Sequence, residues 1–330
     1  MACATRLALT LDGQDFIVSC HDASAPRTLA ALTALLPLPL QLHTPKIAGN
    51  HIYWHAPLVA DAEAPVDVLA TPPGALVYWP VRQMLKIVYA PLQDQPAAVT
   101  VLGTLDGPVT PLAELAARLR SQQGRRVFSG TLSLLPGTGL PGTALIGAGP
   151  TAPSSGLPGD LLGDLPCDLV ADCRTLWHFC PADLLGLTAS RALMHPAGPV
   201  FVAESECRIL HETLWRIRAD MAALDEQTTR ILAALSLNRT AGRIRDFCQL
   251  TSSAALLFRL EQVLADSMLP LTPALDLSIA TAGRLAAWLD LLIPWNDINQ
   301  AFRTALDSAA DAAPNSGADP ATDSPAPPTH

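Results

Sequence analysis

The chain has 330 residues, of which 49% are hydrophobic, 15% charged and 5% aromatic, so it is long enough for about two domains and too apolar to be wholly disordered. Its formal net charge of -9 argues against sequence-independent binding to nucleic acid or to anionic membranes, because both need a basic surface. No apolar run predicts a membrane-spanning helix, and Met1–Asp12 lacks the apolar core of a secretory signal. We therefore expect a cytoplasmic protein with no nucleic-acid partner and no membrane contact.

Composition divides the chain into four segments. Residues 1–133 carry nine basic and nine acidic side chains, so the remainder accounts for the whole net charge. Residues 134–166 are rich in Gly and Pro, which sustain neither helix nor strand hydrogen bonds, and predict a flexible linker. Residues 308–330 have almost no large apolar side chain and predict a disordered tail. The chain is therefore expected to be multidomain, with a first domain at 1–133 and an all-α domain at 167–307.

The first segment is typical of strands with two short helices. Seven runs predict strands, at Thr5–Thr10, Phe16–Cys20, Asn50–His55, Ala75–Trp79, Leu85–Tyr89, Val99–Leu105 and Arg125–Leu132. The first two flank the Asp12-Gly13 turn and predict a hairpin. Two helices are expected, one from Pro26 to Pro37 and one from Thr110 to about Gly124.

The last large segment is typical of helices. Apolar residues three and four apart between Cys207 and Leu235 form a seam of about four heptads. The seam belongs either to a bundle within the chain or to a contact between two copies. A homo-oligomer would form through Leu210, Leu214, Ile217, Met221 and Leu224. Further helical stretches at about Arg239–Met268 and 272–294 favour the bundle within the chain.

The seven cysteines are odd in number and scattered, which predicts free thiols rather than a disulfide framework. Cys167, Cys173, His178 and Cys180 lie close in sequence, but their spacing does not match the paired knuckles of a zinc site. We expect buried, unreactive thiols and no metal; a nucleophilic cysteine with His178 as its base is the alternative. The Gly-rich segment lacks the sequence of a phosphate-binding loop, and no cofactor is expected.

The order of residues in the first segment resembles a known family. After a hairpin come Ala25-Pro26-Arg27-Thr28, Leu35-Leu36-Pro37-Leu38, Gly49-Asn50-His51-Ile52-Tyr53-Trp54 and Pro73-Gly74-Ala75-Leu76-Val77-Tyr78-Trp79-Pro80. Over about residues 5–132 this resembles the small bacterial cyclophilin-like domains. The resemblance implies a closed β-barrel with helices over its openings, and it suggests a pocket without an assigned reaction. Prolyl-isomerase activity is not expected, because the Arg-bearing strand and Gln-rich turn that polarise the prolyl amide are absent from the sequence.

The candidate ligand-binding residues lie on the predicted strand Asn50–His55 and on or between the predicted strands Ala75–Trp79 and Leu85–Tyr89. The period of two puts His51, Tyr53 and His55 on one sheet face, where the two histidines lie about 13 Å apart and too far to share a metal. Arg82 follows the aromatic strand end Tyr78-Trp79, and a guanidinium beside aromatic rings suits a flat carboxylate. The purely structural alternatives are an ordinary barrel surface and an Arg82 stacked on Trp79. The candidate ligand-binding set is Tyr53, His55, Tyr78, Trp79, Arg82 and Tyr89.

Three hypotheses for function follow. We favour a non-catalytic binding protein, in which a cyclophilin-like barrel holds a small carboxylate, a cyclic amide or a peptide and the helical domain mediates association. The alternative is a cytoplasmic catabolic enzyme or accessory subunit that acts on a small cyclic amide or carboxylate. It would use His55 as acid or base and Arg82 as anion clamp, so both side chains must face one cavity. The third is an interaction scaffold that works through the helical domain.

Overall fold

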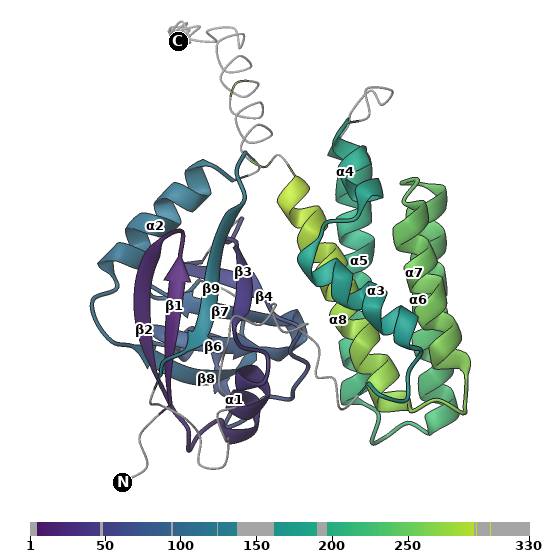
Figure 1. Cartoon of the computed structure of the whole chain (residues 1–330), viewed down its shortest axis with the longest axis horizontal. Helices are drawn as coiled ribbons and strands as arrows, with labels where there is room; N and C mark the ends of the chain where they lie inside the picture. The colour runs from purple at the N-terminus through teal and green to yellow at the C-terminus, as the bar shows by residue number, and fades with distance from the viewer. Residues whose placement is uncertain are drawn as a thin grey trace, which may run out of the picture. The chain divides into compact units, whose positions relative to one another are not determined.

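The computed structural model describes residues 5–46, 49–93, 95–123, 125–136, 162–189 and 197–293, together with 295 and 304. The described residues up to 293 belong to one compact unit. This unit contains a nearly closed antiparallel β-barrel in the N-terminal part and several helices towards the C-terminus (Figure 1). Strand β9 ends at Leu134 and the next described helix begins at Cys167, so most of the predicted linker lies outside the described residues, as does the predicted tail.

Antiparallel pairing builds the barrel. Its strands are β1 (Arg6–Leu11), β2 (Gln14–Cys20), β3 (Leu38–Leu42), β4 (His51–His55), β5 (Val66–Asp67), β6 (Ala75–Trp79), β7 (Met84–Val88), β8 (Ala98–Leu105) and β9 (Phe128–Leu134). The order is β3-β9-β1-β2-β8-β6-β7-β4, and β5 pairs with β8 off this path. A single bridge between His43 and Tyr53 joins the two ends, because each backbone N–H donates to the other's carbonyl, at 2.8 and 3.0 Å. The predicted strands are all confirmed, within a few residues at their ends.

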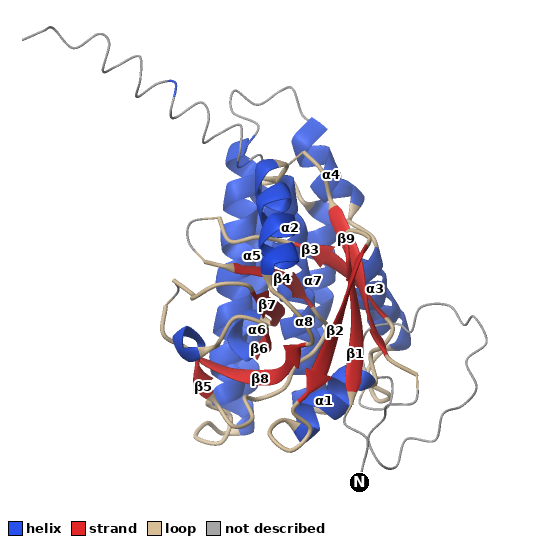
Figure 2. Cartoon of the chain, turned by 90° about the vertical axis from the view of Figure 1, so that its left-hand side faces the viewer, coloured by secondary structure: helices blue, strands red, loops and turns tan. Residues whose placement is uncertain are grey.

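Local chemistry accounts for several of these elements. Asp12 and Gly13 both have positive φ, 47° and 80°, as a two-residue hairpin turn requires. Helices α1 (Pro26–Thr33) and α2 (Thr110–Ser121) begin at or beside a proline, and in both views they lie at opposite ends of the barrel (Figures 1 and 2). Alternate side chains of the strands fill an apolar interior that includes Ile52.

Strand β3 was not predicted from the sequence. Its leucines at 38, 40 and 42 are buried in alternation, which is the strand pattern. Pro39 obscures this pattern, because proline has no N–H to donate to a neighbouring strand. The structure accommodates Pro39 because it is exposed on β3, which is the last strand of the hydrogen-bonded order.

Six further helices follow the barrel. They are α3 (Cys167–His178), α4 (Ala182–Ala189), α5 (Ala197–Ala219), α6 (Glu226–Asp246), α7 (Thr251–Ala265) and α8 (Leu271–Leu292) among the described residues. Helix α6 packs along α7 and α5 along α8 (Figure 1). No helix in the described part of the chain combines the length and the apolar character needed to cross a membrane.

The predicted seam from Cys207 to Leu235 is wrong as one continuous helix. Helix α5 ends at Ala219, and Asp225 begins α6 by accepting the N–H of Thr228 at 2.8 Å. Of the residues expected to mediate association, Leu210, Leu214 and Ile217 are buried, while Met221 and Leu224 lie in the turn between the helices. Leu235 is 62% exposed. The bundle within the chain is the arrangement seen; association of two copies stays a prediction.

Candidate functional site

The two faces of β4 have different surroundings. Trp54 is buried in the barrel interior with Ile52, whereas His51, Tyr53 and His55 form a row on the other face, as predicted. Successive ring centroids in this row are 5.8 and 5.9 Å apart. The period of two therefore places the three polar rings side by side.

Of the other candidate residues, Trp79 and Arg82 lie on the same face as this row. Trp79 belongs to the apolar cluster against which Tyr53 packs. The Arg82 guanidinium lies 5.8 Å from the Trp79 ring centre and forms an ion pair with Glu212 of α5. The predicted stacking is present, and the guanidinium also has a carboxylate partner from within the chain.

Tyr78 and Tyr89 lie elsewhere. The Tyr78 side chain is in the barrel interior, where its hydroxyl donates to the carbonyl of Leu58 at 2.8 Å. Tyr89 packs against the barrel core, and its hydroxyl accepts a hydrogen bond from Arg120 at 3.1 Å. The structure therefore does not bring these two residues together with Tyr53 and His55.

His43, which sequence reasoning did not select, occupies the centre of the polar row. Its ring stacks on Tyr53 with centroids 5.0 Å apart and 17° between the planes, and it meets His55 edge-on at 5.6 Å. Its Nδ1 lies 3.2 Å from Oδ2 of Asp290 on α8. Lys46 Nζ lies 3.2 Å from the same oxygen. The segment that follows β3 is thus joined to α8 by one buried carboxylate.

Burial keeps His43 neutral. Burial lowers the pKa of His43, and the hydrogen bond to Asp290 offsets this only in part. Burial alone would raise the pKa of Asp290, but the hydrogen bond from His43 and the charge of Lys46 outweigh it and hold that pKa below its usual range. Asp290 is therefore ionised at neutral pH.

Helix α5 contributes a second charged pair. Nε and Nη2 of Arg208 lie 3.0 and 2.8 Å from Oε1 of Glu204. About a fifth of each side chain is accessible, at 20% and 18%. Within the described residues, Nη1 of Arg208 and Oε2 of Glu204 make no hydrogen bond. Arg208 can therefore donate a further hydrogen bond through Nη1, and Glu204 can accept one through Oε2.

Helix α8 approaches the barrel closely at Gly283. A Cβ at this position would lie 3.0 Å from Nε2 of His211 on α5 and would overlap Oε1 of Gln83. Gln83 follows a short helical turn, η2 (Pro80–Arg82), with a left-handed φ of 48° that directs the chain into β7. The missing side chain at Gly283 is what admits Gln83 and His211.

Several buried polar atoms at this place have no hydrogen-bond partner among the residues described. They are both amide atoms of Gln83, both ring nitrogens of His211, Nδ1 of His55 and Nε2 of His43. We call the following set the seam cluster: His43, Tyr53, His55, Gln83, Glu204, Arg208, His211, Gly283 and Asp290. Native proteins bury few such atoms without a partner, so this concentration needs an explanation.

The imidazoles of the seam cluster are neutral at pH 7. Burial lowers the pKa of His211 to about 3, with smaller contributions from Arg208 and Arg82. Burial, and next the charge of Arg208, also lower the pKa of His55 well below its ordinary value. Neutral rings have one nitrogen that donates and one that accepts. The cluster therefore offers several uncharged hydrogen-bonding groups beside two ion pairs.

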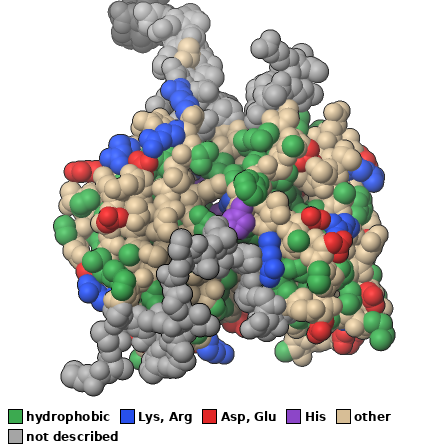
Figure 3. Space-filling view, viewed as in Figure 1, with side chains coloured by type: hydrophobic (Ala, Val, Ile, Leu, Met, Phe, Trp, Pro, Cys, Tyr) green, Lys and Arg blue, Asp and Glu red, His purple; other side chains and the backbone are tan. Residues whose placement is uncertain are grey.

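The surface is open near histidine side chains. In the space-filling view, a histidine is visible at a hollow in the surface (Figure 3). The partly accessible Arg208 and Glu204 side chains show that solvent also reaches the seam cluster. The seam cluster therefore combines buried polar atoms that have no partner among the described residues with two charged side chains that solvent reaches.

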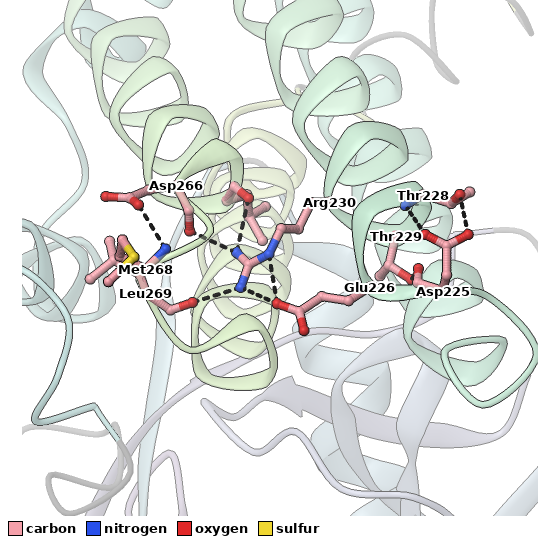
Figure 4. Close-up of polar contacts among 9 residues, drawn as sticks. Asp225, Glu226, Thr228, Thr229, Arg230, Asp266, Met268 and Leu269 are labelled. Atoms are coloured by element: carbon pink, nitrogen blue, oxygen red, sulfur yellow. Dashed lines mark hydrogen bonds and ion pairs between the residues drawn. The ribbon is translucent and has the colours of Figure 1, made fainter.

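Arg230 on α6 is buried, and its environment differs from that of Arg208 (Figure 4). Nε and Nη2 of Arg230 donate to Glu226, and the remaining contacts reach the backbone carbonyls of Leu264, Asp266 and Leu269 at 2.6 to 3.1 Å. All three guanidinium nitrogens thus have partners within the chain. Arg230 therefore fastens the connection between α7 and α8 and leaves no nitrogen for a ligand.

The cysteine segment shows no sign of a reactive centre. Burial raises the pKa of Cys173 to about 12 and that of Cys180 to about 11, which disfavours the nucleophilic thiolate. Cys167 is exposed. Throughout the described ranges, no three His, Cys, Asp or Glu side chains converge in a way that could hold a metal ion.

Sequence reasoning found Tyr53 and His55 but missed most of the seam cluster. His43 follows the unpredicted strand β3. The Glu204–Arg208 spacing of four was an available signal, since acid before base suits a helical ion pair. Asp290, one of two acids in a helix that is mostly buried, was a second signal.

Comparisons with known proteins show a likeness of fold. No protein-family model matches the sequence, and no curated protein matches it. The fold is similar to that of McbB in complex with tryptophan, with a TM-score of 0.64, 15% identity, and coverage of 89% of this chain and 99% of that chain. A hypothetical protein from Archaeoglobus fulgidus, AF2241, reaches a TM-score of only 0.31 at 18% identity over 41% of this chain and 98% of its own, too low to bear on the fold. At such identities the likeness to McbB shows a shared fold and nothing more.

Proposed function

We propose that the chain binds a small aromatic molecule with a carboxylate, of which an aromatic amino acid is the simplest example, in the seam cluster. The observation that carries this proposal is the group of buried polar atoms without partners on Gln83, His55 and His211. Each such atom costs about 1–3 kcal/mol when it is left unsatisfied. A polar ligand that bonds to several of them recovers this cost, whereas a purely structural role leaves it unexplained.

The charges of the cluster suit the two ends of an amino acid. The free Nη1 of Arg208 can donate to a carboxylate, and the free Oε2 of Glu204 can accept from an ammonium group. The stacked rings of His43 and Tyr53 provide a flat surface for an aromatic side chain. Arg208 and His211 are three residues apart on α5 and so lie on one face of that helix, and Gln83 meets His211 at Gly283.

The structural likeness supports the choice of the first ligand to test. McbB has been solved in complex with tryptophan, and its fold matches this chain over nearly all of both proteins. We therefore take tryptophan as the probe. We also propose that the barrel is of the cyclophilin-like type, which its near closure and the helices at its two ends support.

An enzyme acting on such a molecule is the second candidate. The enzyme hypothesis requires His55 and Arg82 to face one cavity, and both side chains lie on the side of the barrel that meets α5. His55 is neutral with Nδ1 unpartnered, as a base needs to be, whereas Arg82 is already paired with Glu212. Incubation of any bound compound with the protein, followed by NMR of the mixture, separates turnover from binding.

Titration calorimetry with tryptophan tests the binding proposal on the full chain. Arg208→Gln removes the carboxylate donor and is expected to weaken binding at least about tenfold. Arg259→Gln removes a cation that pairs with Asp168 and Asp172 outside the cluster, and should leave the affinity unchanged. No heat of binding, or equal affinities for Arg208→Gln and the wild type, would overturn the proposal and favour the scaffold hypothesis.

A further inference from the structure

We propose that His43, fixed by Asp290, selects ligands whose aromatic ring carries its own hydrogen-bond donor, such as an indole N–H or a phenol O–H. This inference rests on the proposed function and assigns a specificity-determining residue within the same site. It follows from the protonation, the rigidity and the surroundings of one imidazole.

The contact with Asp290 determines which nitrogen of His43 accepts. The ionised carboxylate of Asp290 has no hydrogen, so His43 Nδ1 must carry the hydrogen of the 3.2 Å contact. A neutral imidazole has only one N–H, and Nε2 is therefore a bare acceptor. Among the described residues, neither His55 nor His211 has a ring nitrogen bonded to a carboxylate, so His43 is the ring whose acceptor is determined.

The ring of His43 is held rigidly. Its backbone makes both hydrogen bonds of the bridge that joins the barrel ends, at 2.8 and 3.0 Å to Tyr53. Its side chain is stacked on Tyr53 and lies edge-on to His55. Only 2% of the residue is exposed, and Nε2 has no partner among the described residues. Because the ring cannot rotate, Nε2 remains an unsatisfied acceptor unless a ligand donates a hydrogen bond to it.

The surroundings favour an uncharged donor over an ammonium group. The charged groups that act on His43 are Asp290, Lys46 and Arg284, and both cations lower its pKa. Asp290 is already shared between His43 and Lys46, so a further cation at Nε2 would meet two positive charges and little free negative charge. Glu204 remains the better partner for a ligand's ammonium group. A neutral ring N–H or O–H suits Nε2.

A ligand without this donor leaves a buried acceptor unsatisfied. Sites built to bond a ligand N–H or O–H discriminate strongly against analogues that lack it. The loss of one neutral hydrogen bond corresponds to a discrimination of about 5- to 150-fold. His43 therefore selects the aromatic ring of the ligand, while Arg208 binds its carboxylate and Glu204 binds its ammonium group.

Two ligand pairs test the inference by titration calorimetry with the full chain. Tryptophan is compared with 3-(3-benzothienyl)alanine, in which sulfur replaces the ring N–H, and tyrosine with phenylalanine. The wild type is expected to prefer the donor-bearing member of one pair by about 5-fold or more. The pair that shows the preference identifies the donor as an indole N–H or a phenol O–H.

His43→Asn is the matched variant. An asparagine amide can still donate to Asp290 but has no group at the position of Nε2, so the preference should fall to near unity. His21→Asn, on an exposed histidine of the barrel surface, should retain it. If His43→Asn does not fold, long-range 1H–15N spectra of histidine-labelled wild type take its place: they should show the Nδ1–H form of His43 and a shift of Nε2 on addition of the preferred ligand.

The outcomes separate the two proposals. Equal affinities within both pairs for the wild type, an undiminished preference in His43→Asn, or an Nε2–H form of His43 would overturn the inference while leaving the binding proposal standing. Absence of binding by all four compounds would overturn both.

Discussion

Gln83 from the barrel and His211 from α5 meet at the bare Cα of Gly283 on α8. A Cβ on Gly283 would overlap Oε1 of Gln83 and lie 3.0 Å from Nε2 of His211. Three elements that are far apart in sequence therefore contact one another at a residue without a side chain. Because Gln83 and His211 are fully buried, neither can move into solvent to make room.

Gly283→Ala is expected to destabilise the fold by about 1–3 kcal/mol, because an added methyl group forces buried neighbours out of place. It should also weaken tryptophan binding, since Gln83 and His211 are displaced. Gly242→Ala is the matched control: this glycine also lies in a helix, but nothing lies within 4 Å of its added Cβ. Alanine there should stabilise the helix by up to ~1 kcal/mol. Urea denaturation measures the change in free energy of unfolding for each substitution. Equal changes would contradict the close contact of Gly283 with Gln83 and His211.

The sequence predicted the barrel better than the helical part, for a physical reason. Alternation of apolar residues indicates a strand with one buried face, and β1 follows it throughout. The leucines of β3 alternate in the same way, but Pro39 obscured that pattern. The heptad seam continued past Asp225 because apolar spacing carries no information about a helix end. The capping Asp225 was the signal for the break, since its carboxylate accepts the N–H of Thr228.

The site was predictable only in its local part. The period of two placed Tyr53 and His55 on one face, but it could not indicate what covers that face. His43 and Asp290 are 247 residues apart, and Gln83 meets Gly283 across a similar distance in sequence. Such contacts arise from packing of α5 and α8 on the barrel, which no local pattern encodes. Tyr78 was misleading for the same reason, because strand composition did not reveal that its hydroxyl is satisfied inside the barrel.

Glu63 should make the first helix sensitive to acid. Its carboxylate accepts the N–H groups of Arg27 and Thr28, at 3.2 and 2.6 Å, and thereby caps α1. Burial raises its pKa, but hydrogen bonds from Thr28 and Arg27 outweigh this and lower the pKa to about 2. A carboxyl with a lowered folded-state pKa stabilises above its ordinary pKa, and this contribution is lost as the pH falls towards 2.

Glu63→Gln is therefore expected to cost about 1–2 kcal/mol at pH 7, the range for loss of a helix cap. The difference from the wild type should shrink between about pH 4.5 and pH 2. Urea midpoints measured across this range check it, with Glu114→Gln on the exposed face of α2 as control. A difference that stays constant with pH would show that the charge of Glu63 is not what caps the helix.

Arg230 should be essential for the connection between α7 and α8 (Figure 4). Arg230→Met leaves the carbonyls of Leu264, Asp266 and Leu269 without their donor, and we expect a loss of about 3 kcal/mol. Arg230→Lys should not restore it, because one ammonium group cannot reach partners on three sides. Hydrogen exchange should locate the loosening around residue 268. Tryptophan binding should be retained, and its loss in Arg230→Met would contradict a purely structural role.

Asp290 should contribute more to stability than other acids of the helical part, because it joins α8 to the segment that follows β3. Asp290→Asn leaves the charge of Lys46 without its carboxylate, and removing one partner of a buried pair costs about 3–5 kcal/mol. The folded-state pKa of Asp290 lies below its ordinary value, so its contribution is present at neutral pH and declines as the pH falls below that ordinary value.

Thermal or urea unfolding of Asp290→Asn and the wild type at neutral and acidic pH measures this contribution. The difference in free energy of unfolding between the wild type and Asp290→Asn should be large at pH 7 and small at acidic pH. Asp246→Asn removes a carboxylate from an exposed pair with Arg245 and should leave the midpoint unchanged, since exposed ion pairs contribute little. If both substitutions change the unfolding midpoint equally, Asp290 does not hold α8 against the barrel. The fixed orientation of His43, which depends on Asp290, would then also lack support.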